Sequence, residues 1–578
     1  MESTSLSLEI VRTLRGRLHA CEIINEAGKS FIPDGILEHL LDENTVRSLL
    51  KQLVSQGEPL INDEEYTPKL CNQNRPFRKI LAILLLIELP CAIKAFMDLG
   101  IDDSALPMQD PEQFLSCEHL EPSSDADSKS NWKLLAESGL NHANLHEIYR
   151  KQWCVLAPHF GERGSIPHYK LTQNDILPFL QIPLQSPSHS EVLQSSNQAV
   201  IYGSFSQVRK VEIHPNHHDF GDYGISNPDN HFAIKSLQTN NYDDFAQEIE
   251  IFKRYWKSKL HIVSLLSTFE ITETVFGNHY HTYCLIFPWA KGNLMTFWEM
   301  NGSLVRNQKV LPWITRECYE IVRALSYIHG DIDDQIASAD SFGRHGDIQP
   351  SNILWYPNPP ETNLDDFGKL VLADFGLADF HRASSKSNSS MSSLPVSVTY
   401  RAPEFDTSEV ISQKIDIWAL GCTFLEYITW FLKGYNAVQG EFRGYRSEFD
   451  KYKIFADIFF RVQTNNGLQD VFLKPQVMKW IILLRQERSC SKYLKEFLNI
   501  IQEDMLVVDR LKRGSAEKIC QKLEKLYRQY SVDMDYCQHT KPASPITNEK
   551  ANGLGNRPAS FLRKVFRRHF RYKNDVRQ

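Results

Sequence analysis

The spacing of apolar residues changes near residue 195, and this change constrains the fold more than any other feature of the chain. Short β-type runs follow it, at 199–202, 207–213, 232–236 and 282–287. From Leu311 onward the apolar residues recur mainly at helical spacing. A β-rich segment followed by a helix-rich segment predicts an α+β unit with two lobes.

The segment before this unit has a helical pattern. Apolar residues recur at helical spacing at 6–14 and at 36–41, whereas 121–131 and 185–198 are polar and rich in Ser. We expect five parts: a helical N-terminal region at 1–120, a loop-rich connecting region at 121–194, the two-lobed unit at 195–530, a flexible linker at 531–560 and a basic amphipathic tail at 561–578.

The 578-residue chain carries a formal charge of −7, but the charge is unevenly spread. Residues 551–578 contain eight Lys or Arg and one Asp, so the rest of the chain is more acidic than the total implies. A body without a basic field is not expected to bind specific nucleic acid. The tail, with apolar residues at helical spacing, is expected to bind an anionic membrane or an acidic partner. An autoinhibitory segment and a solvated tail are the alternatives.

The eleven cysteines are scattered and show no zinc-ligand spacing, which is typical of reduced thiols in an intracellular protein. The first residues lack the basic flank and apolar core of a secretory signal. The most apolar run, 80–87, is too short to span a membrane, since a span needs about 20 apolar residues. We therefore expect the protein in the cytoplasm or the nucleus.

One strand-like run ends in a lysine. Residues 232–235 read Phe-Ala-Ile-Lys, and Lys235 can hold the α- and β-phosphates of a nucleotide. Glu248 lies thirteen residues later in a helical run, from which it can pair with Lys235. Taken singly, an edge lysine and a solvated glutamate are the ordinary interpretations of these residues.

Two later motifs place carboxylates beside strands. Residues 345–352 read His-Gly-Asp-Ile-Gln-Pro-Ser-Asn, in which Asp347 can orient a hydroxyl group and Asn352 can ligate a metal. The apolar strand at 369–373 is followed by Asp374, and a carboxylate at a strand end can bind Mg²⁺ that bridges two phosphates. Further on, Glu404 needs a buried cationic partner, for which Arg513 is the candidate.

Each of these motifs is weak by itself, but their order along the chain is specific. In this order the chain resembles a eukaryotic protein kinase of the Ser/Thr type over roughly 195–530. Within that family it most resembles kinase-domain proteins of filamentous fungi. The resemblance implies a bilobal fold with a β-rich N-lobe and a helical C-lobe, preceded by the mainly helical N-terminal region. It rests on residues in the family's order: Gly203, Lys235, Glu248, Asp347, Asn352, Asp374-Phe375-Gly376, Ala402-Pro403-Glu404, Asp416 and Arg513.

The resemblance implies transfer of the ATP γ-phosphate to Ser or Thr hydroxyls of a protein substrate, with ATP and Mg²⁺ required. Asp347 is then the catalytic base, Lys235 and Asn352 complete the catalytic set, and Asn352 and Asp374 hold the metal. Phe287 falls at the gatekeeper position, and the hinge after it offers the Pro288 carbonyl and the Ala290 amide to adenine. The expected nucleotide-binding residues are Gly203, Val208, Ala233, Lys235, Glu248, Phe287, Pro288 and Ala290.

A second Asp-Phe-Gly triplet begins at Asp366. It lies 19 residues after Asp347, closer to the family's usual gap than Asp374, which lies 27 residues after it. Asp366 follows a polar stretch, however, whereas Asp374 ends an apolar strand. We therefore predict that Asp374 is the metal ligand and that 356–368 form an enlarged hairpin loop.

Three departures from the family leave the activity open. The glycine-rich loop at 201–208 keeps only Gly203, Gln349 stands where the family usually has lysine, and Gly346 replaces the usual arginine. The alternative to an active enzyme is a pseudokinase scaffold that binds partners without efficient transfer. The Gly346-Asp347 pair with Gln349 is also similar to small-molecule phosphotransferases such as aminoglycoside and choline kinases, although 402–404 and 416–421 argue against that class.

Two regions carry no catalytic pattern. The N-terminal helical region is interpreted as the place where a regulatory partner binds. His214, His217 and His218 lie in an insertion between strands, and their spacing matches no set of metal ligands, so we expect them in a solvated loop.

Overall fold

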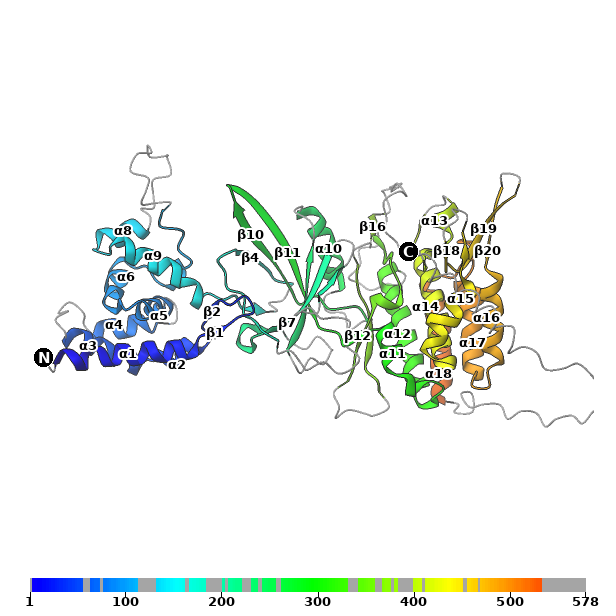
Figure 1. Cartoon of the computed structure of the whole chain (residues 1–578), viewed down its shortest axis with the longest axis horizontal. Helices are drawn as coiled ribbons and strands as arrows, with labels where there is room; N and C mark the ends of the chain where they lie inside the picture. Colours follow the sequence, from blue (N-terminus) through cyan, green and yellow to red (C-terminus); the bar gives the residue numbers. More distant parts are fainter. Residues whose placement is uncertain are drawn as a thin grey trace, which may run out of the picture.

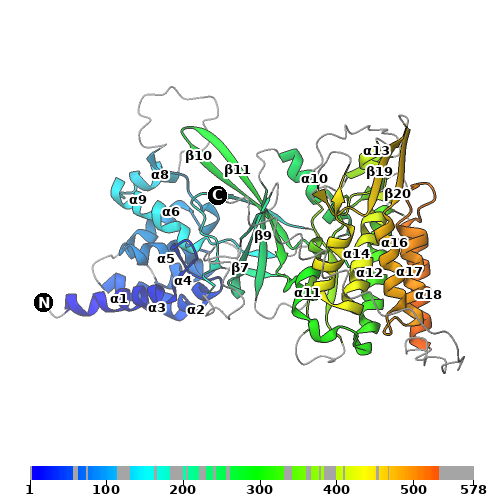
Figure 2. The same cartoon turned by 45° about the vertical axis from the view of Figure 1, so that its right-hand side comes forward.

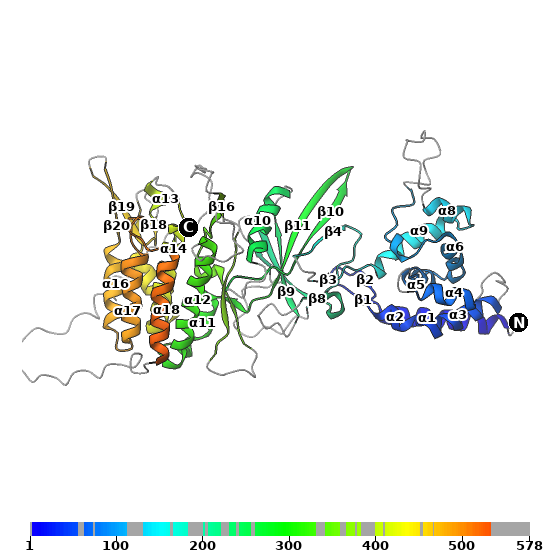
Figure 3. The same cartoon turned by 180° about the vertical axis from the view of Figure 1, so that it is seen from behind.

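The computed structural model has three parts in a row along its long axis, as Figure 1 shows from one side and Figure 3 from behind. Helices of the N-terminal region lie at one end, a sheet lies in the middle, and a helical lobe lies at the other end. The structure describes residues 3–55, 63–72, 76–112, 131–161, 166–182, 200–202, 206–220, 230–237, 242–255, 261–330, 341–358, 366–375, 379–382, 399–407, 411–450, 455–465 and 468–532. Gly203, the tail and the predicted linker beyond Val532 lie outside these residues.

The N-terminal region folds around its own apolar core. The most apolar run of the sequence becomes a short helix whose residues 80–86 are all buried, so it is a core helix as expected. The elements of this region are α1 (Ser3–Cys21), β1 (Ile23–Ile24), β2 (Ser30–Phe31), α2 (Ile36–Leu40), α3 (Glu43–Ser55), α4 (Asp63–Leu70), α5 (Arg78–Leu86), α6 (Ile93–Leu99), α8 (Asn131–Glu137) and α9 (His142–Lys151).

The middle sheet has seven strands in the order β4-β10-β11-β9-β7-β5, with β6 paired to β7. All pairs are antiparallel except β4 with β10. A helix, α10 (Tyr242–Tyr255), lies beside the sheet (Figure 2). Its Phe245 stacks on Tyr283 of β11. The strands are β4 (His168–Thr172), β5 (Phe179–Leu180), β6 (Val200–Tyr202), β7 (Ser206–Ile213), β9 (His231–Leu237), β10 (Ser267–Val275) and β11 (Asn278–Pro288).

The region predicted as loop-rich, 121–194, contributes more structure than its sequence indicates. It supplies α8 and α9. Its strands β4 and β5 form the two edges of the sheet, where β4 pairs with β10 and β5 pairs with β7. A further strand, β3 (Phe160–Gly161), pairs with β8 (His218–Asp219). Short edge strands such as these depend on the neighbouring strand for their hydrogen bonds, so their own residues give little pattern.

The helical lobe contains short strands as well as helices. Its helices are α11 (Leu294–Met300), α12 (Leu311–His329), α13 (Glu404–Thr407), α14 (Lys414–Lys433), α15 (Arg443–Arg446), α16 (Pro475–Gln486), α17 (Lys492–Ile500) and α18 (Ala516–Val532). Its strands are β12 (Gly292–Asn293), β13 (Ser341–Arg344), β14 (Ile353–Tyr356), β15 (Lys369–Leu372), β16 (Asp379–Arg382), β17 (Glu448–Phe449), β18 (Phe455–Ala456), β19 (Phe460–Asn465) and β20 (Leu468–Leu473).

Helix α14 is the centre of this lobe. Among the described residues it is the one helix long and apolar enough to cross a membrane by composition, and its apolar window is entirely buried inside the protein. A second buried feature is the ion pair predicted from sequence: Arg513 donates to both carboxylate oxygens of Glu404, at 2.8 and 3.2 Å. Both side chains are buried, which confirms this pairing. The two-lobed α+β arrangement is thus the predicted one.

The N-terminal region contacts the sheet through the segment between β1 and α2. Asn25 donates to the Leu177 carbonyl (2.9 Å), the Glu26 amide donates to the Phe179 carbonyl (2.8 Å), and the Glu26 carboxylate pairs with Arg209. His217, which we expected in a solvated loop, is fully buried at this junction. It accepts from the Asp34 amide and donates to the Pro158 carbonyl, so it is a neutral structural imidazole. The sequence prediction for His217 was wrong because its partners lie in other segments.

Candidate active site

Lys235 stands at the junction of the sheet and the helical lobe. It lies on β9, and its Nζ donates to Glu248 on α10 (2.7 Å) and to Asp374 beyond β15 (3.0 Å). Burial alone would lower the pKa of this ammonium group, but the two carboxylates outweigh it and raise the pKa. The structure therefore brings together three of the predicted residues around one permanent positive charge.

Asp416, at the start of α14, fixes the backbone of the loop that carries Asp347. The buried Asp416 carboxylate accepts from the backbone amides of His345 (2.8 Å) and Gly346 (2.9 Å) and from His329 Nε2 (2.8 Å). Burial opposes ionisation of this group, yet these donors hold its pKa below the usual value. The ionised Asp416 thus fixes the backbone just before Asp347.

Asp347 accepts hydrogen bonds from two neighbouring amides. Gln349 Nε2 lies 2.9 Å and Asn352 Nδ2 lies 2.8 Å from its Oδ2. Asn352 Nδ2 also donates to the Asp347 carbonyl (2.8 Å), which leaves its amide oxygen as the atom able to ligate a metal. Burial raises the pKa of Asp347 and outweighs these two amides. A raised pKa makes this carboxylate a stronger base.

Asp374 has a backbone conformation that few residues other than glycine adopt. Its φ is 63°, in the left-handed region, and its side chain is 52% exposed. The next residue, Phe375, is buried between Phe252 of α10 and His345. Asp374 therefore points a half-exposed carboxylate to the same place as Lys235. Carboxylate and amide oxygens such as those of Asp374 and Asn352 are the ligands that Mg²⁺ prefers.

Four of the residues predicted to bind the nucleotide lie on one face of the sheet. The register pairs Val208 with Lys235 and Ala233 with Phe287, so these four side chains share one face. Phe287 is buried against Phe252, which narrows the space behind it.

The hinge after Phe287 has one contact that the sequence does not indicate. The Pro288 carbonyl, expected to accept from adenine, accepts a hydrogen bond from the hydroxyl of Tyr356 on β14 (3.0 Å). A carbonyl oxygen has a second lone pair, so both contacts are compatible. Tyr356 was missed because no local pattern links it to the hinge. Gly203, expected above the phosphates, lies outside the described residues, as does Gly376.

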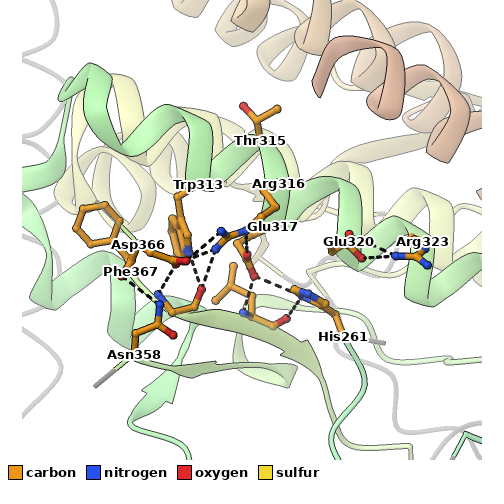
Figure 4. Close-up of polar contacts among 12 residues, drawn as sticks. His261, Trp313, Thr315, Arg316, Glu317, Glu320, Arg323, Asn358, Asp366 and Phe367 are labelled. Carbon is orange, nitrogen blue, oxygen red and sulfur yellow. Dashed lines mark hydrogen bonds and ion pairs between the residues drawn. The ribbon is translucent and has the colours of Figure 1, made fainter. Parts of the chain in front are cut away.

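The second Asp-Phe-Gly triplet lies away from this site, and Figure 4 shows its surroundings. Arg316 of α12 donates to both oxygens of Asp366, at 3.1 and 2.8 Å. Burial opposes ionisation of Asp366, but Arg316 holds its pKa below the usual value. Phe367 packs against Trp313, whose Nε1 donates to the Gly368 carbonyl (2.7 Å).

The glycine of this triplet is required by the backbone. Gly368 has a φ of 97°, and a Cβ atom there would lie 2.0 Å from the Tyr356 carbonyl oxygen. The 366–368 triplet lies in the connection between β14 and β15, which pair as the predicted hairpin. Its partners are Arg316 and Trp313 of α12 and the backbone of Tyr356.

Comparison with known proteins completes these observations. The family model of the protein kinase domain matches residues 224–523, just over half of the chain. Over 199 residues the chain is 30% identical to a proline-rich receptor-like protein kinase of Arabidopsis thaliana, which covers 34% of this chain and 23% of that protein. It is 26% identical over 168 residues to a serine/threonine-protein kinase of Schizosaccharomyces pombe, which covers 24% of this chain and 47% of that protein.

The similarity extends to an animal protein. The chain is 29% identical over 148 residues to cyclin-dependent kinase 14 of Oryctolagus cuniculus, which covers 25% of this chain and 26% of that protein. The chain thus spans less than half of the length of each of these relatives. They come from a plant, a yeast and a mammal, and the narrower resemblance to filamentous-fungal proteins stays a prediction.

Proposed function

The chain belongs to the protein kinase family, and on this premise we propose that it transfers the γ-phosphate of ATP to Ser or Thr hydroxyls of a protein substrate. The observation that carries the proposal is the position of Lys235, which joins Glu248 and Asp374 across the two lobes at 2.7 and 3.0 Å. This arrangement supports a site that is closed for nucleotide binding, because the lysine on the sheet and the carboxylate on the other lobe meet.

Each residue has a proposed role that its contacts support. Lys235 binds the α- and β-phosphates, and Glu248 fixes its direction. Asp374 and the amide oxygen of Asn352 would hold Mg²⁺, which would supply positive charge next to the phosphates. Asp347 orients the attacking hydroxyl and accepts its proton. The reaction needs little covalent chemistry from the protein, so position and charge supply most of the catalysis.

The adenine ring is proposed to lie against Val208, Ala233 and Phe287. The Ala290 amide supplies the donor and the Pro288 carbonyl the acceptor, the latter shared with Tyr356. Gly203 is proposed to let the backbone of the glycine-rich segment at 201–208 approach the phosphates.

A second candidate is a pseudokinase scaffold, and Gln349 is the observation that favours it. Gln349 donates to Asp347 from the position where a cation would lie near the γ-phosphate. A neutral amide supplies less stabilisation to a developing charge than an ammonium group does. A scaffold would keep the two lobes and bind partners, with little transfer.

Partners and location are proposed on the sequence alone. The N-terminal helical region binds a regulatory partner, and the basic tail at 561–578 binds an anionic membrane or an acidic protein. The cytoplasm and the nucleus are the proposed locations.

The test is transfer of labelled phosphate from ATP with Mg²⁺, to the protein itself and to a generic basic protein. Asp347→Ala removes the proposed base, and Asp509→Ala, an exposed carboxylate at a turn, is the control. We expect labelling by the wild type and by Asp509→Ala and none by Asp347→Ala. No labelling by any folded variant would favour the scaffold. Equal labelling by all three would contradict the proposed role of Asp347.

A further inference from the structure

The strand that leads to Asp374 is held on both sides. On one side β15 pairs with β14, and the Ala373 amide donates to the Asn352 carbonyl (2.9 Å). On the other side the segment after α10 runs alongside it. The Val263 amide donates to the Leu372 carbonyl (2.9 Å), and the Leu372 amide donates to the His261 carbonyl (2.8 Å). We call residues 372–375 the front end of β15.

The opposite end of this strand, residues 366–370, we call the rear end. It is held by Glu317, a carboxylate on α12 whose side chain is 1% exposed (Figure 4). Glu317 Oε2 accepts from the Leu370 amide (2.8 Å), and Oε1 accepts from Arg316 Nε (2.9 Å). His261 Nδ1 lies 3.3 Å from Oε2 and donates to the Leu370 carbonyl (2.6 Å).

These contacts need a carboxylate. The Leu370 amide and Arg316 Nε are both donors, and each takes a different oxygen of Glu317. A glutamine has one amide oxygen, so its NH₂ group would face one of the two donors. A buried donor without an acceptor is unfavourable, and the contact would open.

The backbone at the front end explains why this anchoring matters. Asp374 is held at a φ of 63°, which persists only where the surroundings over-determine it. The anchors beside it are β14 and the segment 261–263. His261 of that segment donates to the Leu370 carbonyl, and the Leu370 amide donates to Glu317. Glu317 therefore contacts β15, the strand that leads to Asp374, and its Oε2 lies 3.3 Å from Nδ1 of His261 in the segment that follows α10, the helix that carries Glu248.

We propose that Glu317 is a positioning residue of the phosphate-transfer site: it fixes the rear end of β15 and the segment 261–263 so that Asp374 lies beside Lys235. The inference rests on the proposed function, since Asp374 is the proposed metal ligand. Glu317 does not contact the reacting groups, and it acts through the backbone of β15.

The test compares Glu317→Gln with Glu320→Gln. Glu320 lies one turn further along α12 and pairs with Arg323, with no hydrogen bond or ion pair to the described residues of β15 or 261–263, so it is the matched control (Figure 4). For Glu317→Gln we expect kcat to fall by about tenfold or more and the half-saturating Mg²⁺ concentration to rise by about tenfold, with KM for the protein substrate unchanged. Glu320→Gln is expected to stay within about twofold of the wild type. Equal kinetics of the two variants would overturn the proposal.

A second pair of measurements separates position from stability. Trp480→Phe removes a buried hydrogen bond from α16 to Thr429 of α14, remote from β15. If Trp480→Phe lowers the melting temperature as much as Glu317→Gln but leaves the Mg²⁺ dependence unchanged, loss of stability does not explain the effect. If Trp480→Phe shifts the Mg²⁺ dependence equally, the proposal is overturned.

Hydrogen exchange of the nucleotide-free protein gives a readout that needs no activity. We expect the amides of Leu372 and Ala373 to exchange faster in Glu317→Gln than in Glu320→Gln. This result decides the inference even if the wild type transfers no phosphate, which would remove the proposed function alone. Equal exchange in the two variants would overturn the inference while leaving the proposed function standing.

Discussion

The two Asp-Phe-Gly triplets, at the rear and the front end of β15, have the same spelling and different surroundings. At the rear end both terminal nitrogens of Arg316 donate to Asp366, and residue 368 must be glycine because the backbone of Tyr356 leaves no room for a Cβ atom. At the front end Asp374 is half-exposed, has a left-handed backbone and shares Lys235 with Glu248. The elements around a carboxylate, and not its tripeptide, determine what it can bind.

The contrast is one of exposure and strain. At each end one cation serves two carboxylates. Arg316 binds Asp366 and Glu317 at the rear end. Lys235 binds Glu248 and Asp374 at the front end. Asp374, however, is more exposed than Asp366 and has a strained backbone, which is common at functional sites. The predictions below test this contrast, beginning with the largest expected effect.

The largest difference is expected between two lysines. Lys235→Met removes the cation at the front end, and we expect kcat/KM for ATP to fall by at least about 100-fold, which is about 2.7 kcal/mol. Lys369→Met, at the rear end, keeps an apolar stem of similar length and should stay within about twofold. Steady-state transfer assays measure both. Equal losses would remove the contrast between the two ends.

Stability should depend on the rear end. Arg316→Leu removes the ion pair of Asp366, which keeps the Gly368 amide as a donor, and leaves one oxygen of the buried Glu317 without its donor. We expect the free energy of unfolding to fall by about 2 kcal/mol. Arg323→Leu breaks an exposed pair on the same helix and should cost less than about 0.5 kcal/mol. Urea denaturation of both variants gives the comparison. A loss no larger for Arg316→Leu than for Arg323→Leu would show that the rear end is not a structural anchor.

The third prediction concerns Gln349, the neutral residue that donates to Asp347. Gln349→Lys places a cation next to Asp347 and near the γ-phosphate, so we expect kcat to rise by about tenfold. Asp347 must be ionised to accept a proton, and burial raises its pKa, so activity falls as the pH drops through that raised value. The lysine should lower this pKa and move the acid limb of the pH profile to lower pH. An unchanged profile would contradict the role of Asp347 as base.

The smallest expected effect is the contribution of Asp366 to the stability of the protein, which should depend on pH. Its pKa is lowered in the folded state because Arg316 outweighs burial, so its contribution is present above the unfolded pKa and is lost as the pH falls through the lowered value. Asp366→Asn should therefore melt about 1–2 °C below the wild type at neutral pH, and the gap should close in acid. A gap that is constant with pH would show that the ion pair contributes nothing.

The front end was predictable because its residues stand in local patterns. A lysine in a strand, a glutamate in a helix and an aspartate at a strand end can each be recognised from the residues around them. Their order along the chain predicted that they form one site. Glu317 and His217 were not predictable in this way. Glu317 reads as a solvated residue of an amphipathic helix, and its burial depends on Leu370, which lies 53 positions away. His217 is buried by segments from the N-terminal region, and β4 and β5 form because existing strands offer them an edge.

The most direct test is the Mg²⁺ dependence of ATP binding to Asp374→Asn and Asp366→Asn, measured by calorimetry. We expect Mg²⁺ to strengthen ATP binding to the wild type and to Asp366→Asn, and to have little effect on Asp374→Asn, because only the front-end carboxylate lies beside Lys235. If Asp366→Asn loses the Mg²⁺ dependence and Asp374→Asn keeps it, the metal site belongs to the rear triplet and the proposed roles of the two ends are reversed.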